Sequence, residues 1–230
     1  MPTEFQTKKI LNSLRKYKQK YLIKRFSELD ESATRLMVNS FLTETLGYEE
    51  LAEIKTEYAI RGAYADYVIQ IGNKKQIVVE VKSIQAGLNE HHLRQALSYA
   101  ANEGIDWVLL TNGRTCELYR VIFSKPVGCQ RIFSADLSQM DQLKKFAPAI
   151  TCLTKKLVEK GELEKYWKRC QALNPVNVSR YLLSSDVVRF VRRKLRKEAK
   201  ILFHEEDVFD SIYAVISNKL ELPKPRHKRT

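Results

Sequence analysis

The stretch Gln76-Ile77-Val78-Val79-Glu80-Val81-Lys82 decides the fold, because it reads as a buried strand that ends in charge. Its nearly continuous apolar run is typical of a central strand covered on both faces. Gly72-Asn73 just before it is a turn signal, and residues 64–71 also read as a strand, so the two should pair. Glu80 lies inside the apolar run, where a charge needs a lysine or a metal ion as its partner.

Patterns of apolar residues on either side of this hairpin predict the remaining elements. Helices are expected at 5–26, 31–46 and 89–103, and strands at 52–60, 64–71, 76–82, 107–111, 116–123 and 129–133. Asp30 can cap the second helix, and Gly104 can end the third. The order helix, three strands, helix, strand favours an α/β sandwich with a mixed sheet.

The chain after residue 137 has a different pattern, in which the strand signals fade. Helices are expected at 139–170 and 178–220, with Pro175 between them. One of them carries seven cations and one anion within residues 189–200. The members expected to contact nucleic-acid phosphates are Arg189, Arg192, Arg193, Arg196 and Lys197. The alternative is a solvated charged face, which is what most such helices are.

Charge is distributed unevenly along the 230 residues, whose formal net charge is +13. Residues 1–30 carry 8 basic and 3 acidic side chains, and residues 123–230 carry 23 and 12. Residues 31–122 carry 9 and 12, so the middle is acidic between two basic flanks. A polyanionic partner is expected, and the chain separates the carboxylates that bind metal from the cations that bind phosphate.

Several other classes of protein are not expected. No run of 18 apolar residues is present, and the N-terminus lacks the apolar stretch of a secretory signal, so a cytoplasmic protein without a membrane span is predicted. The four cysteines form no Cys-x-x-Cys pair, which indicates free thiols rather than a zinc site. The sequence contains no Gly-x₄-Gly-Lys-(Ser/Thr) loop, so no ATP site is expected.

Three charged residues can form a site at the end of the hairpin. Glu80 and Lys82 are two apart in a strand and therefore project from one face. Asp66 lies six residues before Gly72 and Glu80 eight after it, so pairing can bring the two acids together, although the sequence does not determine the register. Adjacent carboxylates attract Mg²⁺ or Mn²⁺, and a nearby lysine suits phosphodiester hydrolysis. The alternative is that both acids are solvated.

These residues resemble a known pattern. Asp66 followed by Glu80-Val81-Lys82 resembles the D…(D/E)-x-K signature of the PD-(D/E)xK nuclease superfamily, with Ala65 where a proline is expected. Gln95-Ala96-Leu97-Ser98-Tyr99 resembles the Gln-x₃-Tyr motif after the nuclease core of type I restriction enzyme R subunits. Further segments resemble the same N-terminal nuclease domain: Glu31-Ser32-Ala33-Thr34-Arg35, Leu46-Gly47-Tyr48, Glu57-Tyr58, and Trp107-Val108-Leu109-Leu110-Thr111-Asn112-Gly113.

The resemblance covers about residues 28–122 and implies a restriction-endonuclease-like αβββαβ core. It implies that Asp66 and Glu80 ligate Mg²⁺ or Mn²⁺ and that Lys82 is the catalytic lysine. Glu31 on the preceding helix would complete the catalytic set, with Glu28 as the competing choice.

Two further residues take their implied role from the same resemblance. Gln95 and Tyr99 lie four apart on one helical face and would contact nucleic acid or support the lysine. The alternative is an ordinary helix packed on the sheet, with Tyr99 in the core.

The sequence as a whole predicts a basic N-terminal helix at 1–27, a nuclease-like domain at 28–137, a basic helical region at 138–222 and a disordered tail at 223–230. The expected function is metal-dependent DNA cleavage of restriction or anti-phage type, without a helicase motor. Two alternatives are a non-catalytic nucleic-acid-binding module with the same fold, and a nuclease subunit of a larger restriction complex. A homodimer is compatible with either.

Overall fold

The structure, a computed structural model, describes residues 2–60 and 63–217. Within these residues six strands form one sheet in the order β1-β2-β3-β4-β5-β6. The strands are β1 Ile54–Ile60, β2 Ala63–Ile71, β3 Lys74–Val81, β4 Trp107–Thr111, β5 Thr115–Ile122 and β6 Gly128–Asp136. All neighbours are antiparallel except β3 and β4, which are parallel. The predicted mixed sheet is therefore confirmed.

The predicted core order is also confirmed. Helix α2 (Glu31–Ser40) precedes β1, β2 and β3, and helix α3 (Glu90–Glu103) connects β3 to its parallel neighbour β4. A parallel pair needs such a crossover, because a tight turn can join only antiparallel strands. Strand ends differ by a few residues from expectation, most of all in β6, which is longer than the predicted 129–133.

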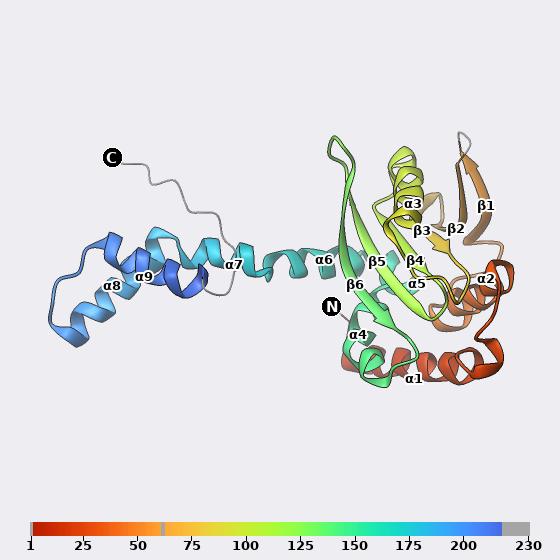
Figure 1. Cartoon of the computed structure of the whole chain (residues 1–230), viewed down its shortest axis with the longest axis horizontal. Coiled ribbons are helices and arrows are strands. Elements are labelled where there is room, and N and C mark those ends of the chain that lie inside the picture. Colours follow the sequence, from red (N-terminus) through yellow and green to blue (C-terminus); the bar gives the residue numbers. More distant parts are fainter. Residues whose placement is uncertain (1, 61–62, 218–230) are drawn as a thin grey trace. The chain divides into compact units, whose positions relative to one another are not determined.

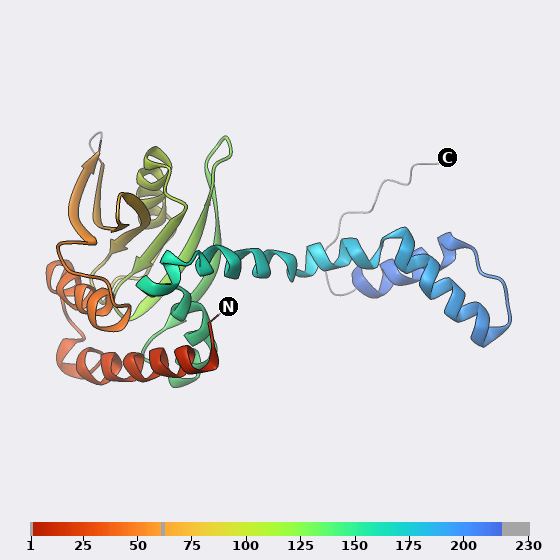
Figure 2. The same ribbon diagram turned by 180° about the vertical axis from the view of Figure 1, so that it is seen from behind.

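Side chains alternate between the two faces of the sheet and build two cores. On β3, Ile77, Val79 and Val81 belong to one buried cluster, whereas Val78 belongs to the other, which also contains five residues of α3. Most helical members of the first cluster come from α1 (Glu4–Tyr21), α2 and α4 (Met140–Cys152), and others are Phe41, Leu42, Val158 and Leu163. Figures 1 and 2 both show α1 and α4 side by side. Burial on both faces explains why β3 reads as an apolar run.

Helix α1 is part of this core. Its Ile10, Leu14 and Tyr17 are buried, and the Tyr17 hydroxyl donates a 2.8 Å hydrogen bond to the Gly113 carbonyl after β4. The compact unit therefore runs from residue 1 to 167, which differs from the boundaries expected at 27 and 137. The helix ends at Tyr21, short of the predicted residue 26, and residues 24–26 form a 3₁₀ turn.

The predicted helix ends are confirmed where a capping residue signals them. Asp30 accepts a 2.7 Å hydrogen bond from the Ala33 amide at the start of α2. Gly104 adopts a left-handed φ of 66° after α3. The second helix is α-helical only as far as Ser40, and residues Phe41–Thr45 continue it as a π-helical turn, η2.

The two long helices predicted after residue 137 are each divided into three. The expected helix 139–170 is broken after Cys152 and again at Gly161, whose φ is 66°. Pro175 does not separate two helices but opens one, at the first position, where its missing N–H costs nothing. The helices are α5 Lys155–Glu159, α6 Glu162–Ala172, α7 Pro175–Leu182, α8 Ser185–Ala199 and α9 Glu205–Ser217.

The second compact unit begins at Lys168, and its described residues are 168–217. We call residues 168–217 the C-terminal helical unit. The disordered tail expected at 223–230 lies outside the described residues, as does the end of the expected helix 178–220. Throughout the described part of the chain, no helix combines the length and the apolar character needed to cross a membrane.

Candidate active site at the end of the hairpin

The β2–β3 hairpin brings the two predicted acids together. Tyr67 is paired with Val79, and one more step in this register places Asp66 opposite Glu80. The Val81 amide donates a 2.7 Å hydrogen bond to Oδ2 of Asp66, so the Asp66 side chain reaches across to β3. The pairing left open by the sequence is thus the one that builds a site.

Glu80 and Lys82 form a close pair at the end of β3. The Lys82 Nζ lies 2.8 Å from Oε1 of Glu80, whose side chain is 2% exposed. Lys82 continues the pairing with β4 by one residue, because its amide donates to the Thr111 carbonyl at 2.9 Å. The apolar neighbours of Glu80 bury it, and Lys82 supplies the partner that a buried charge needs.

Helix α2 adds two residues to the site, Glu31 and Arg35. Oε2 of Glu31 lies 3.7 Å from the Lys82 Nζ, and its Oε1 lies 3.0 Å from a terminal nitrogen of Arg35. The Arg35 Nε lies 2.6 Å from Oδ1 of Asp66. Of the two competing acids, Glu31 is the one at the site, because Glu28 is exposed in the turn before α2.

Hydrogen bonds from buried or half-buried side chains fix α2 against the sheet and against the loop after Lys82. The Tyr67 hydroxyl donates to the Arg35 carbonyl at 2.8 Å. Thr34, fully buried, accepts from the Ile84 amide at 3.2 Å. On the other side of this loop, the Asn112 amide donates to the carbonyls of Ile84 and Ala86. Asn112, in the sequence motif that ends β4, therefore holds this loop in place.

Burial dominates the electrostatics of the two acids. Burial raises the pKa of Glu80 to about 6, with the charges of Asp66 and Glu31 adding to the rise and Lys82 opposing it. Burial also raises the pKa of Asp66, against the Val81 amide and the charges of Arg35 and Lys82. For Lys82, burial lowers the pKa, but the bond and charge of Glu80 outweigh it, so the net shift is upward. Lys82 is therefore a charged ammonium at neutral pH.

The donor set suits a hard divalent cation in its chemistry. Three carboxylates, of Asp66, Glu80 and Glu31, face two cations, Lys82 and Arg35, which leaves one negative charge. The pKa values of Asp66 and Glu80 are raised. Oxygen ligands of this kind are those that Mg²⁺ prefers. Among the described residues, however, no three His, Cys, Asp or Glu side chains are close enough to hold an ion. Asp66 and Glu80 are the pair that would hold it, and their present partners are cations.

His92 is a neighbour of the site that the sequence pattern did not single out. Its neighbour in sequence, His91, is exposed, but His92 on α3 is half-buried and its Nδ1 has no hydrogen-bond partner among the described residues. Burial, then the charges of Lys82 and His91, lower its pKa. The position of His92 one helical turn before Gln95 indicates that it lies near the site, but nothing in the sequence distinguishes it from His91.

The structure separates the two residues of the Gln-x₃-Tyr motif. Gln95 is exposed on α3, where a nucleic acid can reach it. Tyr99 is 1% exposed and belongs to the core between α3 and the sheet. Direct contact between Tyr99 and nucleic acid, one of the two expected roles, does not fit this burial. The alternative of a core tyrosine fits.

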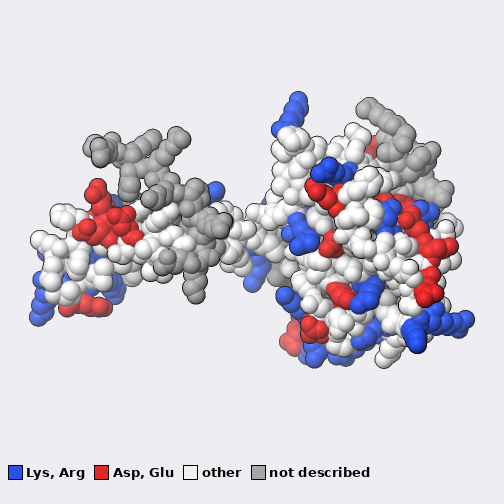
Figure 3. Space-filling model, in the orientation of Figure 1, with Lys and Arg blue, Asp and Glu red and all other residues white. Residues whose placement is uncertain are grey.

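The basic residues of α8 lie outside this site, in the C-terminal helical unit. Arg189, Arg193 and Arg196 follow one helical face and are exposed. Arg189 pairs with Asp186, and the half-buried Arg192 pairs with Glu205. Arg193, Arg196 and Lys197 form no ion pair with a described residue. Figure 3 shows basic and acidic side chains gathered in separate patches on this unit.

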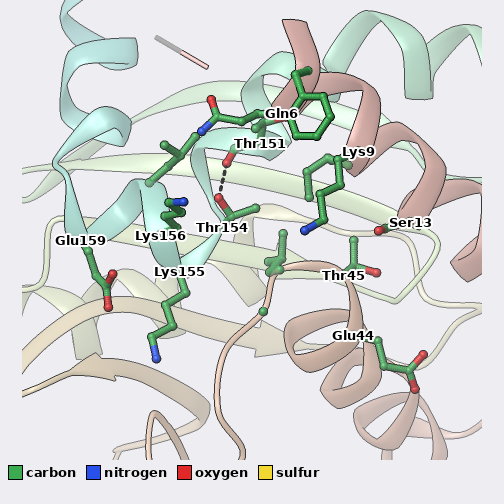
Figure 4. Close-up of a pocket in the computed structure, with 15 residues that line it drawn as sticks. Gln6, Lys9, Ser13, Glu44, Thr45, Thr151, Thr154, Lys155, Lys156 and Glu159 are labelled. Carbon is green, nitrogen blue, oxygen red and sulfur yellow. Dashed lines mark hydrogen bonds between the residues drawn. The ribbon is translucent and has the colours of Figure 1, made fainter. Parts of the chain in front are cut away.

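A pocket of about 630 Å³ lies elsewhere in the first unit, between α1, η2 and α5 (Figure 4). Lys9, Ser13 and Thr45 line one side of it, and Lys155 and Glu159 line the other. None of the predicted site residues lines this pocket. The pocket is therefore separate from the residues of the predicted site.

The fold and the site define an α/β domain with an Asp–Glu–Lys cluster at the end of a central hairpin. Residues 30–128 match the family described as type I restriction enzyme R protein N terminus. This match confirms the family resemblance expected from the motifs, and it includes every residue of the site described above.

Two other comparisons were made. No curated protein matches the sequence. Among solved structures, a chain of the "cryoEM structure DrdV-DNA complex" matches with 15% identity and a TM-score of 0.37, covering 94% of this chain. This chain spans 21% of the length of that one.

Proposed function

We propose that this chain is a Mg²⁺- or Mn²⁺-dependent DNA endonuclease of restriction or anti-phage type. The observation that carries the proposal is the convergence of Asp66, Glu80 and Lys82, from two strands, within a segment that matches the restriction R-protein family. The spacing of the sequence alone indicates each of the three, and chance pairing of a buried Glu with a Lys would not also bring Asp66 opposite it.

The mechanism assigns one task to each side chain. A divalent cation, when bound, polarises a phosphoryl oxygen and makes a water more acidic. Asp66 and Glu80 would hold the cation through their oxygens. Lys82 would offset charge that develops on the phosphate in the transition state, because it stays protonated and points to Glu80. Glu31, 3.7 Å from Lys82, would orient the lysine.

The decisive experiment is cleavage of supercoiled plasmid with Mg²⁺ or Mn²⁺. We expect Glu80→Gln, Asp66→Asn and Lys82→Ala each to lower the rate by at least about 100-fold. Glu117→Gln is the matched control: Glu117 is also a buried acid paired with a cation, Arg131, but on β5. Wild-type protein that does not cut, or a Glu80→Gln variant that cuts at the wild-type rate, would refute the proposal.

A second candidate function is a nucleic-acid-binding module that retains the fold without catalysis. The observation in its favour is that cations already neutralise Asp66 and Glu80, and that no three-residue metal cluster is formed by the described residues. It predicts DNA binding that is insensitive to EDTA and to Asp66→Asn, with no cleavage under any metal. The two candidates thus differ in one plasmid assay.

The partners of the proposed enzyme follow from its charge. DNA is the polyanion that the basic flanks would hold through the cations of α8. Gln95 on α3 would contact the DNA near the site. Two cuts in a duplex need two sites, so a homodimer, or partner subunits of a restriction complex, would complete the activity. Sedimentation of the pure protein with and without duplex DNA distinguishes a dimer from a monomer that needs other subunits.

A further inference from the structure

Arg35 lies among the acids of the candidate site but has no part in the proposed mechanism. Its Nε is 2.6 Å from Oδ1 of Asp66, and one terminal nitrogen is 3.0 Å from Oε1 of Glu31. The Nε is also a buried atom without a hydrogen-bond partner, so its contact with Asp66 is an ion pair and not a well-directed hydrogen bond. At Asp66 the guanidinium is therefore held by charge, which another cation can replace, while its terminal nitrogen donates a hydrogen bond to Glu31.

The position of Arg35 conflicts with metal binding at Asp66. Oδ2 of Asp66 accepts from the Val81 amide, a contact that the β2–β3 pairing holds in place. Oδ1 accepts no backbone hydrogen bond and is the more open oxygen for a metal ion, and it is the atom that Arg35 contacts. A divalent cation bound to Oδ1 would repel the guanidinium, whose Nε lies 2.6 Å from the same oxygen, so both cannot stay.

Arg35 is also suited to bind a phosphate once a metal ion displaces it from Asp66. Its side chain is 34% exposed, whereas that of Lys82 is 14% exposed and is held by Glu80. A guanidinium presents five N–H donors in a planar fork that matches two oxygens of a phosphate. Its backbone stays fixed meanwhile, because the Arg35 carbonyl accepts from the Tyr67 hydroxyl.

We propose that Arg35 is an exchangeable cation, which neutralises Asp66 and Glu31 in the free protein and moves to a phosphate of the nucleic acid when a divalent ion takes Asp66. This inference deepens the proposed function and rests on it for the identity of the substrate. In the free protein, the charge of Arg35 reduces the repulsion between the carboxylates, which favours folding. The exchange also couples metal binding to substrate binding. Arg35 is then a phosphate-binding residue of the loaded site.

The first test is metal affinity without nucleic acid, measured as free Mn²⁺ by electron paramagnetic resonance. Arg35→Met keeps the length of the side chain and removes its charge, so we expect Mn²⁺ to bind about 10-fold more tightly, the scale on which a neighbouring charge changes a carboxylate's affinity for a proton. Arg35→Lys should bind with intermediate affinity. The matched control is Arg94→Met, which removes an exposed arginine paired with Glu90 four residues earlier, and it should bind as the wild type does.

The second test is duplex DNA binding in saturating Ca²⁺, followed by fluorescence anisotropy across a salt series. Arg35→Met should weaken binding by about 10-fold and lower the salt slope by about 1, as loss of one phosphate contact does. Arg35→Lys should restore part of the affinity. Circular dichroism in EDTA checks that the variants fold. If Arg35→Met does not fold, Arg35→Lys replaces it in both tests.

The outcomes separate this inference from the proposed function. If the wild type cuts DNA but Arg35→Met binds Mn²⁺ no more tightly than the wild type, the exchange is refuted and the nuclease stands. If Arg35→Met binds Mn²⁺ more tightly but neither protein cuts, the exchange is supported and the nuclease is refuted. If Arg35→Met binds Mn²⁺ more tightly and DNA with unchanged affinity and salt slope, the phosphate role is refuted.

Discussion

The two compact units differ most in what they do with apolar side chains. The first unit, residues 1–167, buries them in two clusters, one on each face of its sheet. The C-terminal helical unit buries only Ser179, Val188 and Val208 among its described residues. It contributes ten of the seventeen exposed large apolar side chains in the described chain. The first unit thus has the packed interior that the proposed catalytic cluster needs, whereas the C-terminal helical unit leaves most of its side chains exposed to solvent.

The same contrast holds for charge. In the first unit, charges at the site are matched atom to atom, as between Lys82 and Glu80 or between Arg35 and Asp66. In the C-terminal helical unit, Arg193, Arg196 and Lys197 pair with no described residue. Paired, buried charges favour a defined geometry, whereas exposed, unpaired cations favour contact with a polyanion of any sequence. We therefore expect substitutions in the first unit to show mainly in measurements of stability, and substitutions in the C-terminal helical unit to show mainly in measurements of nucleic-acid affinity.

The largest expected difference between the units is in stability. Leu14→Ala opens a cavity under α1, where Leu14 is 0% exposed, and should cost about 3 kcal/mol of unfolding free energy. Leu202→Ala, at a position that is 75% exposed, should change it by less than about 0.5 kcal/mol. Urea unfolding followed by circular dichroism measures both. Equal losses at the two positions would show that the second unit is packed as tightly as the first.

The next effect is on nucleic-acid affinity. Neutralising the α8 set, Arg189, Arg192, Arg193, Arg196 and Lys197, with Gln should weaken duplex binding in EDTA by about 10- to 100-fold at moderate salt and flatten the salt dependence. A matched variant replaces five cations of α1, namely Lys8, Lys9, Arg15, Lys16 and Lys20.

The α1 variant should lose less affinity, because Lys8 and Lys20 are already paired with Glu4 and Glu44. Anisotropy titrations at several salt concentrations compare the two. If the α1 variant loses as much affinity as the α8 variant, the basic surface is shared by both units and the contrast drawn above is wrong for charge.

The smallest effect is the pH dependence that Glu80 gives to the metal-free first unit. Burial raises the pKa of Glu80 in the folded protein to about 6 from its ordinary value of 4.5, so its contribution to stability is complete below about pH 4.5 and is lost as pH rises through 6. Between about pH 4 and pH 7 the loss amounts to about 2 kcal/mol. Glu80→Gln lacks it, so the wild type should lose stability relative to this variant as pH rises in EDTA. Parallel pH profiles would contradict the burial of an ionisable Glu80.

How far the sequence predicts this molecule depends on whether a feature is local. The αβββαβ order, the cap at Asp30 and the left-handed Gly104 follow from periodicity and from residues adjacent in the chain. The breaks at Gly161 and Lys200 were missed, because one left-handed residue divides a helix without changing the apolar pattern on either side. The first unit extends beyond its predicted limits, because the burial of α1 depends on distant α4.

The same rule holds for the site. Glu80 and Lys82 share a face by strand geometry, so their pairing could be predicted. Arg35 could not be assigned, although it follows Glu31 by one helical turn, because its contact with Asp66 depends on how α2 is placed against β2. Tyr99 fits the core alternative for a similar reason, since only the packing of α3 determines which of its faces is covered.

The packing of α1 has a consequence for biosynthesis. Tyr17 bonds to Gly113, 96 residues later, and the apolar face of α1 is covered by α4, which ends at Cys152. At synthesis rates of about 5–20 residues per second, a newly made α1 waits on the order of ten seconds before its cover leaves the ribosome. During that interval Ile10, Leu14 and Tyr17 are available to chaperones. Helix α1 is therefore buried only after the elements that follow it, through α4, have been made.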